Sequence, residues 1–373
     1  MGRFGKKNEV KLDPLKYNIG LLGESGIGKS TIMKEVCEKL AGEEGYIALD
    51  IGKEDGHDAI QGIVSEKVED WAKFKEVIDD IIENKDTDYP ELKTVIIDTY
   101  DELCLLAEKE VVRLHNKNRK DGAPKIDSIN SAFGGYGRGL DRAIELMLDA
   151  LWELKKVNVS FILVAHTKKK DLEDVITEEQ YSVLTSNISQ KYFNAIKTKL
   201  HFLGMAYIDR QIVKEKNGKK DFKGNDVLKG KIASESRVIS FRDDTYSVDS
   251  KSRFADIVDS ISFDADEFIK AMNDAIEAER SKSGETLAEA KKREKADDEK
   301  RAKEATEYSQ GKKENNVDED RNEEIIAAIK DKFSTVENDV KKAVKEYMNE
   351  GGYKKFDAEM PTAVLEKCLE MLG

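Results

Sequence analysis

The stretch that decides the fold of this chain is eight residues long: Gly23-Glu24-Ser25-Gly26-Ile27-Gly28-Lys29-Ser30. It fits the phosphate-binding pattern G-x-x-x-x-G-K-[ST] at every position. The apolar run "YNIGLL" precedes it, and "TIMKEVCEKLA", which has helical spacing, follows it. Because the motif functions between a strand and a helix, this context predicts a P-loop nucleotide site.

The motif assigns a role to each part of the site. Lys29 should contact the β- and γ-phosphates of ATP, and Ser30 should hold magnesium. ATP and Mg²⁺ are therefore the predicted cofactors. The nucleotide-binding residues are predicted to be Gly23, Glu24, Ser25, Gly26, Ile27, Gly28, Lys29, Ser30 and Thr31.

Acidic residues follow two of the later strands. Asp98 ends the apolar strand "TVIIDT", where a carboxylate can hold the water shell of magnesium opposite Ser30, whereas Asp101 suits the cap of the following helix. Hydrolysis also needs a group that orients or deprotonates water. Glu54, just past the strand "YIALD", is a candidate for that group. On the residues alone it is one of several acids there, with Asp50, Asp55, Asp101 and Glu102.

The order of the elements predicts the fold class. Strands and helices alternate between residues 17 and 98, which favours a mostly parallel sheet covered by helices. The segments "MAYIDRQIV" and "ESRVISFRDD" predict an antiparallel extension with a turn at Asn217-Gly218. A polar loop is expected from Asn116 to Gly139, and a polar stretch from His166 to about Gln190. We therefore predict an α/β P-loop NTPase core.

The composition changes after about residue 280. A mixed-charge stretch with almost no large apolar residues predicts a solvated helix or a flexible linker. Beyond it, "EEIIAAIKDKF", "VKKAVKEYM" and "AVLEKCLEML" restore helical apolar spacing. The predicted domains are an ATPase core (1–260), a helix and charged linker (261–322) and a small helical module (323–373).

Charge and hydropathy limit the possible partners and location. The net charge of −13 argues against a protein that holds polyanions by its overall field, so nucleic-acid contacts would need local basic patches. We find no apolar run of about 18 residues to cross a bilayer, and the start "MGRFGKKNEV" has no signal-peptide core. We expect no membrane partner and a cytoplasmic protein, in the bacterial host cytoplasm if the chain is phage-encoded.

With these pieces in order, the chain resembles the RecA-like phage ATPases, AAA-family nucleotide-binding proteins found in phage recombination gene clusters. More distantly, it resembles bacterial RecA. The resemblance spans about residues 17 to 255 and rests on "GESGIGKST", "EDGHDAIQGI", "VIIDTYDEL", "GYGRG", "FILVAHTKKK" and "ESRVISFRDD". It implies a RecA-like core, ATP hydrolysis that is slow unless the protein is assembled or stimulated by DNA, and a homo-oligomeric ring or filament.

The resemblance also implies roles for residues outside the P-loop. Glu54 matches the glutamate that activates water after the second strand. His166, after "FILVA", stands where RecA has a glutamine that senses the γ-phosphate and signals to the DNA-binding loop. A strand-end histidine that is simply a satisfied polar residue is the alternative for His166.

A catalytic residue supplied by a neighbouring subunit is implied as well. Arg242 falls where RecA presents a lysine to the ATP of the next subunit, and arginine suits that role because its planar donors match phosphoryl oxygens. Arg237 and Arg253 are rival candidates. Alternatively, Arg242 pairs with Asp243 or Asp244 on a hairpin.

The resemblance implies single-stranded DNA as a partner, bound by the loop from Asn116 to Gly139 and by the stretch after His166. Lysine and arginine give sequence-independent phosphate contacts, and Phe133, Tyr136 or Tyr181 would stack on bases. Solvated charge is the ordinary alternative, and the lysine-rich segment 214–223 is a further candidate. The basic residues concerned are Arg119, Lys120, Arg138, Lys168, Lys169 and Lys170.

Three functions fit this set of motifs. The first is a RecA-like ATPase that assembles on single-stranded DNA and assists annealing, recombination or replication. The second is a ring-forming DNA motor or helicase-loader type of ATPase. The third is a nucleotide-gated adaptor whose C-terminal helices recruit replication or recombination proteins.

Overall fold

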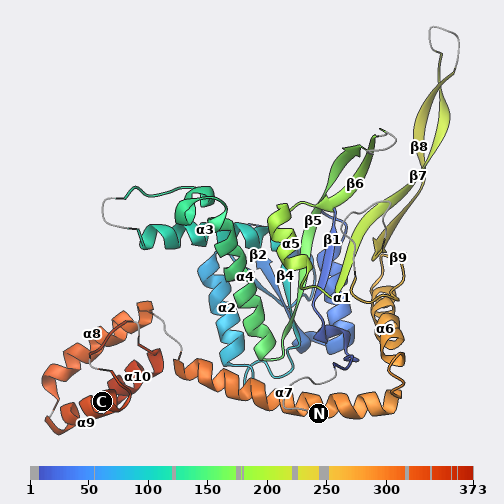
Figure 1. The fold of residues 1–373 in the computed structure, drawn as a ribbon. Coiled ribbons are helices and arrows are strands. Elements are labelled where there is room, and N and C mark those ends of the chain that lie inside the picture. Colours follow the sequence, from blue (N-terminus) through green and yellow to red (C-terminus); the bar gives the residue numbers. More distant parts are fainter. Residues whose placement is uncertain are drawn as a thin grey trace.

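The computed structural model describes most of the chain, and its described elements form an α/β fold around one central sheet (Figure 1). The predicted fold class is confirmed. The described residues are 8–53, 55–119, 123–173, 178, 180–220, 226–242, 252–315, 319–336, 338–353, 355–358 and 360–372.

The sheet runs in the order β3-β2-β4-β5-β1-β7-β8-β9, with β6 paired to β5 outside this path. The pairs from β3 to β7 are parallel, whereas β7–β8, β8–β9 and β5–β6 are antiparallel. The P-loop strand β1 therefore lies inside the sheet, between β5 and β7. The strands are β1 (Ile19–Gly23), β2 (Tyr46–Ile51), β3 (Ser65–Val68), β4 (Thr94–Asp98), β5 (Ser160–Glu173), β6 (Gln180–Ser186), β7 (Phe202–Lys220), β8 (Asp226–Ser240) and β9 (Ser260–Ser262).

Helices cover both faces of the sheet, and each face has its own apolar core. The helices α2 to α5 pack on one face, and α1 and α6 on the other. In α2, Trp71, Phe74, Ile78 and Ile81 recur at helical spacing and are buried, which is why this segment forms a helix against the sheet. The helices are α1 (Lys29–Ala41), α2 (Trp71–Glu83), α3 (Tyr100–Lys117), α4 (Arg138–Lys156), α5 (Gln190–Lys197) and α6 (Ala265–Ser281), with short 3₁₀ turns η1 (Pro14–Lys16), η2 (Glu43–Gly45), η3 (Gly56–Ala59) and η4 (Ile129–Gly134).

Two antiparallel ribbons project from the edge of the sheet that carries the P-loop (Figure 1). The stretch after His166 is polar as expected but does not begin as a loop, because β5 continues to Glu173 and pairs with β6, so that Lys168 lies opposite Thr185. The turn expected at Asn217-Gly218 is wrong. There β7 continues to Lys220, which pairs with Asp226 of β8. In the outer part of both ribbons, the partner strand supplies the backbone hydrogen bonds of polar residues. These segments therefore form strands without an apolar sequence pattern.

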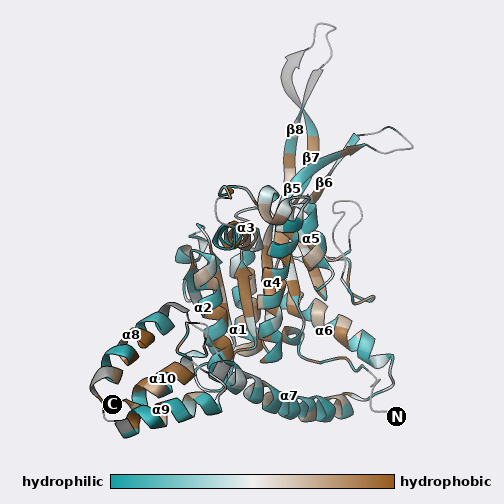
Figure 2. Cartoon of the chain, turned by 60° about the vertical axis from the view of Figure 1, so that its left-hand side comes forward, coloured by the Kyte–Doolittle hydropathy of each residue, from teal (hydrophilic) through white to brown (hydrophobic). Residues whose placement is uncertain are grey.

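The mixed-charge stretch forms the helix α7 (Leu287–Asn315), which lies along the edge where the parallel strands begin (Figure 1). Its contacts with the core are mainly polar: Glu294 bonds Lys16 at 2.8 Å, and Ser309 Oγ donates to the Glu83 carbonyl at 2.8 Å. Figure 2 shows α7 as largely hydrophilic. Within the described residues, no helix has the length and apolar character needed to span a membrane.

The last helices, α8 (Glu319–Thr335), α9 (Asn338–Glu350) and α10 (Thr362–Met371), share a separate small core. Ile329, Val344, Leu365 and Cys368 are fully buried in it. These three helices therefore pack on one another, and α7 precedes them in the chain.

Candidate nucleotide site

The P-loop has the backbone geometry of a phosphate cradle. Gly26 and Gly28 have φ values of 76° and 106°, which residues with a side chain rarely adopt. Gly28 is also the N-cap of α1 and has no side chain to bond the first helical amides. Those amides, at the positive end of the helix dipole, are left to bind an anion.

Lys29 points into this loop. Its side chain is buried, and its ammonium donates to the carbonyl oxygens of Gly23 at 3.1 Å and Glu24 at 3.0 Å. Ser30 is half-buried in the first turn of α1, next to Lys29, and Thr31 is exposed. The lysine of the predicted motif is thus held inside the cradle by the loop itself.

Asp98 lies at the end of β4 and is paired with a histidine that the sequence did not single out. Its Oδ2 is 2.9 Å from Nε2 of His57, which comes from η3, and both side chains are buried. Within the described residues, Nδ1 of His57 has no hydrogen-bond partner. The pairing fixes the Asp98 carboxylate at the sheet edge, as an outer partner fixes a metal-binding carboxylate.

His166 lies between the P-loop and Asp98. It pairs with Gly23 of β1, while Asp98 pairs with Val164 two residues earlier on the same strand. Its backbone N–H donates to Asp101 Oδ2 at 3.0 Å, and its ring Nδ1 is 3.8 Å from the same oxygen. The register therefore places His166 beside Gly23, the last residue of β1, where the P-loop begins.

Asp101 does not cap the following helix as expected. The N-cap of α3 is Thr99, whose hydroxyl accepts from the Glu102 N–H. Burial raises the pKa of Asp101, while the N–H of His166 that it accepts opposes the rise. Within the described residues, its Oδ1 is buried without a hydrogen-bond partner. A buried carboxylate oxygen of this kind is free to accept from a water molecule.

The candidates for the water-activating acid are separated by their partners. Glu54 lies outside the described residues. Asp50 and Asp55 both bond Lys67, at 3.0 and 2.7 Å. Glu102 lies against Gly52, where an added Cβ would be 2.3 Å from its Oε2. Within the described residues, Glu102 thus lies just past the end of β2, and no lysine is bonded to it.

The donors present fit magnesium bound together with a nucleotide. The described residues contain no group of three or more His, Cys, Asp or Glu side chains that would hold a metal by themselves. Magnesium bound to a nucleotide commonly takes one or two carboxylates of the protein, and phosphates and water supply most of the other ligands. Ser30, a buried Asp98 and the unpartnered oxygen of Asp101 match that pattern.

The candidate arginines lie in different places. Arg242 donates from Nη2 to the Phe254 carbonyl at 2.9 Å, at the base of the β7–β8 ribbon. Arg253 donates to the Thr198 carbonyl. Arg237 reaches the P-loop of its own chain, where its Nη1 donates to the Ile27 carbonyl at 3.2 Å. Asp243 and Asp244, the alternative partners of Arg242, lie outside the described residues.

The basic residues proposed to meet DNA are exposed where they are described. Arg119 donates to the carbonyls of Asn116 and Ala123, and Arg138 begins α4. Lys120 lies outside the described residues. Tyr136 is fully exposed, with a relative exposure of 101%. Three consecutive residues of β5, namely Lys168, Lys169 and Lys170, are exposed beyond the P-loop edge.

Sequence reasoning missed two contributors to this site. His57 is 41 residues from Asp98, and no local pattern indicated that the fold would join them. Phe263 packs over the P-loop, with a ring atom 3.4 Å from where a Cβ of Gly28 would stand, close to Arg237. The apolar alternation of "ISF" before α6 was the only signal for Phe263.

The comparisons with known proteins agree with this geometry. A family model described as an AAA domain matches residues 15–254, which is more than half of the chain. The match begins before β1 and includes the P-loop, Asp98, His166 and both projecting ribbons. No curated protein matches the chain.

Proposed function

Because this chain belongs to the AAA domain family of P-loop ATPases, we propose that it hydrolyses ATP as a RecA-like protein assembled on single-stranded DNA. The assembly is a homo-oligomer, either a ring or a filament. Its biological role is to assist phage recombination, annealing or replication. The family match supports the nucleotide chemistry, and the remaining parts of the proposal rest on the residues described below.

The chemistry follows from the positions of the side chains. Lys29 and the amides of the P-loop would hold the phosphates, and Ser30 and Asp98 would hold magnesium, which supplies positive charge to the phosphoryl oxygens when bound. His57 keeps the Asp98 carboxylate in place. Glu54 is the proposed water-activating residue, and Glu102 is the described acid that lies against Gly52, two residues before Glu54 in the sequence.

One observation carries the proposal that DNA and nucleotide are linked. Strand β5 places His166 beside Gly23 of the P-loop and continues without a break through the exposed Lys168, Lys169 and Lys170. A change at the γ-phosphate that moves His166 would therefore act on the basic ribbon only two to four residues away. Such direct continuity suits an ATPase whose DNA affinity depends on its nucleotide.

The main test measures ATP hydrolysis with and without single-stranded DNA, and images particles formed with an unhydrolysable analogue. We expect stimulation by DNA and regular rings or filaments. Lys29→Ala should abolish nucleotide binding, whereas the control Lys34→Ala, on the same helix, should retain it. Hydrolysis that DNA does not change, in a protein that binds no DNA, would overturn the DNA part of the proposal but not the ATPase part.

A second variant tests the contribution of a neighbouring subunit. Arg242→Ala should retain nucleotide binding and lose DNA-stimulated turnover, by about 10³-fold if it acts as an arginine finger. Arg237→Ala should instead weaken nucleotide binding, because Arg237 contacts the P-loop of its own chain. Normal stimulated turnover in the Arg242 variant would move the finger to another residue.

The adaptor function remains a second proposal, because the helices α8 to α10 have a core of their own. In that case a replication or recombination protein would bind these helices only when ATP is bound. A pull-down with the candidate partner, once with an ATP analogue and once with ADP, tests the adaptor function. Equal recovery in both states would count against nucleotide gating.

A further inference from the structure

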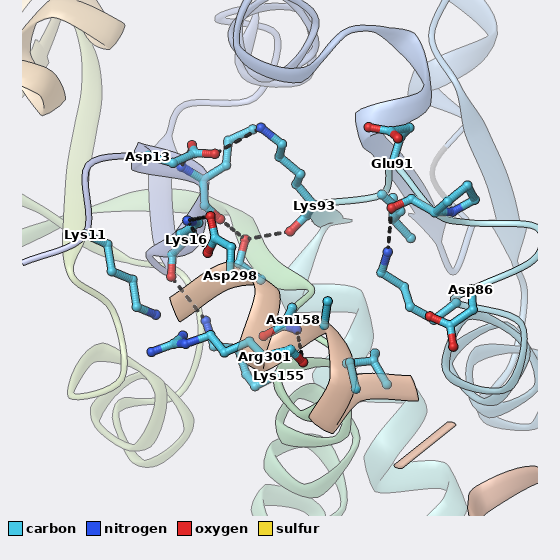
Figure 3. Close-up of a pocket in the computed structure, with 18 residues that line it drawn as sticks. Lys11, Asp13, Lys16, Asp86, Glu91, Lys93, Lys155, Asn158, Asp298 and Arg301 are labelled. Carbon is cyan, nitrogen blue, oxygen red and sulfur yellow. Dashed lines mark hydrogen bonds and ion pairs between the residues drawn. The ribbon is translucent and has the colours of Figure 1, made fainter. Parts of the chain in front are cut away.

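A cavity of about 390 Å³ lies at the edge of the sheet where the parallel strands begin, opposite the P-loop (Figure 3). Its walls come from the N-terminal segment before β1, the segment 85–93 before β4, the end of α4 with the residues that follow it, and the middle of α7. Hydrogen bonds hold these walls together. The side chain of Asn158 donates to the Arg301 carbonyl at 2.8 Å, and the N–H of Leu12 donates to Glu294.

Three cationic side chains gather at one side of this cavity: Lys11, Lys155 and Arg301 (Figure 3). Within the residues that the structure describes, Lys155 donates to neutral oxygens only, namely Asn18 Oδ1 at 2.9 Å and the Lys16 carbonyl at 3.5 Å. Within the described part of the chain, the Lys11 ammonium and the Arg301 guanidinium make no hydrogen bond or ion pair. The cluster therefore has positive charge without a bonded anion.

The nearest acidic groups are already engaged. Lys16 bonds Glu294 at 2.8 Å and Asp298 at 2.6 Å, although the charges of both carboxylates also act on Lys11 and oppose the lowering of its pKa. Asp86 and Glu91 lie on the other side of the cavity (Figure 3). Their charge disfavours a long polyanion running through the cavity, whereas a small anion beside the three cations avoids them.

Electrostatics indicates that the cluster is costly without a ligand. Burial, together with the charges of Lys11 and Arg301, lowers the pKa of Lys155 to about 8. Burial, with the charges of Arg301 and Lys16, likewise lowers the pKa of Lys11 to about 8, although Asp298 and Glu294 oppose this shift. An anion among the three side chains would reverse these effects, because each cation would gain an opposite charge.

We propose that this cavity binds a small phosphate-bearing anion through Lys11, Lys155 and Arg301. A phosphate group presents several acceptor oxygens, and the planar guanidinium of arginine can donate to two of them at once. Three cations also match a group with close to two negative charges better than a single carboxylate. Since the ligands come from three segments, the anion would fasten α7 and the N-terminal segment to the core.

The test uses the full chain with its P-loop saturated by an unhydrolysable magnesium–ATP analogue. Inorganic phosphate and a nucleoside monophosphate are titrated separately by calorimetry at constant ionic strength in chloride. We expect saturable binding of one ligand per chain. Tighter binding of inorganic phosphate identifies a free anion as the source, and tighter binding of the monophosphate identifies a nucleotide.

Matched variants locate the binding. Arg301→Gln and Lys155→Gln should each weaken it about tenfold or more, as expected for lost charge-assisted hydrogen bonds. Lys303→Gln, an exposed neighbour on α7, should change it less than about twofold. No saturable binding, or equal loss in all three variants, would overturn the proposal. Binding of single-stranded DNA at this cluster in place of the small anion would overturn it as well.

Thermal melting gives a second readout that does not depend on nucleotide. In chloride, Arg301→Gln should melt at the wild-type temperature or above it, because it removes a like charge. Phosphate should raise the melting temperature of the wild type and of Lys303→Gln, and should leave that of Arg301→Gln unchanged. A lower melting temperature of Arg301→Gln in chloride would contradict the repulsion on which the proposal rests.

Discussion

Asp98 and Asp101 lie three residues apart, yet the fold gives each its own histidine. Asp98 bonds the ring of His57, and Asp101 accepts the backbone N–H of His166. The first contact holds a carboxylate at the predicted magnesium position, and the second joins α3 to the strand beside the P-loop. At the scale of single residues, the site is therefore organised by contacts between loops that are distant in sequence.

Removing His57 tests its role toward Asp98. His57→Gln should lower the affinity for magnesium, measured by nucleotide binding at graded magnesium concentrations, by about tenfold or more, as for other outer partners of metal sites. Binding of nucleotide without magnesium should change little. Asp58→Asn, at the exposed neighbouring position, is the control. Loss of both kinds of binding would indicate a damaged P-loop rather than a displaced carboxylate.

His201 predicts a pH dependence of stability. Its Nδ1 accepts the Asn18 N–H at 3.2 Å, and burial, with Lys155 and Arg253, lowers its pKa from 6.5 to about 4. Between pH 6.5 and pH 4, His201 is protonated in the unfolded chain but stays neutral in the folded chain. The stability of the folded protein is therefore lost as the pH falls from 6.5 toward 4.

Denaturant unfolding at pH 7 and pH 5 measures this effect. The side chain of His201 is partly exposed, so after allowance for solvent screening its share of the loss should be about 1 kcal/mol. His201→Gln should reduce the difference between the two pH values by that amount. An unchanged difference would mean that His201 titrates normally in the folded protein.

At the scale of elements, the β5–β6 ribbon departs most from what sequence patterns predict. The strands β1, β2 and β4 are apolar runs and were predicted, because strands buried on both faces need such runs. The outer half of β5 is polar from Thr167 onward and takes its structure from pairing with β6. No single-segment pattern contains that information.

The β5–β6 ribbon carries a prediction for DNA binding. Replacing Lys168, Lys169 and Lys170 by Ala should lower single-strand affinity about tenfold or more, and reduce the salt slope by about 2, at about 0.7 per phosphate contact. The control replaces Lys291, Lys295 and Lys303 on α7, at the opposite edge of the sheet. A wild-type salt slope in the ribbon variant would exclude these lysines as phosphate contacts.

The two faces of the ribbon sharpen this test. Successive side chains of a strand point to opposite faces, so Lys168 and Lys170 share one face and Lys169 lies on the other. DNA lying on one face should therefore respond to the Lys168/Lys170 pair and to Lys169 unequally. Equal effects per lysine would instead indicate a strand that wraps around the ribbon.

At the scale of the whole molecule, α7 connects the ATPase core to the C-terminal helices. It was predicted only as a solvated helix or linker, because its contacts use small and polar groups. Ala305 is buried, Tyr308 donates to Glu153, and Ser309 bonds the carbonyl of Glu83. Such contacts leave no apolar stripe in the sequence, so neither the docking nor the cavity beneath α7 was predictable.

Two truncated chains test how much α7 contributes to the stability of the core. A chain ending at residue 315 should retain nucleotide binding and melt close to the full chain, because α7 remains in place. A chain ending at residue 286 should melt about 5 °C lower or more, since about 2 kcal/mol of packing and hydrogen bonding is lost. Equal melting temperatures of the two truncated chains would show that α7 adds nothing to the stability of the core.

The β7–β8 ribbon has one further consequence. Beyond Ala206, β7 pairs only with β8, and beyond Val238 the other edge of β8 is uncovered in the described residues, so about 40 Å of ribbon exposes two open edges. Open edges are templates for amyloid-like growth, and cross-strand ion pairs such as Arg210–Glu235 and Lys231–Glu215 oppose it. High salt weakens those pairs. We therefore expect edge-to-edge association of this ribbon to increase with salt concentration. This association would differ from an assembly that depends on nucleotide.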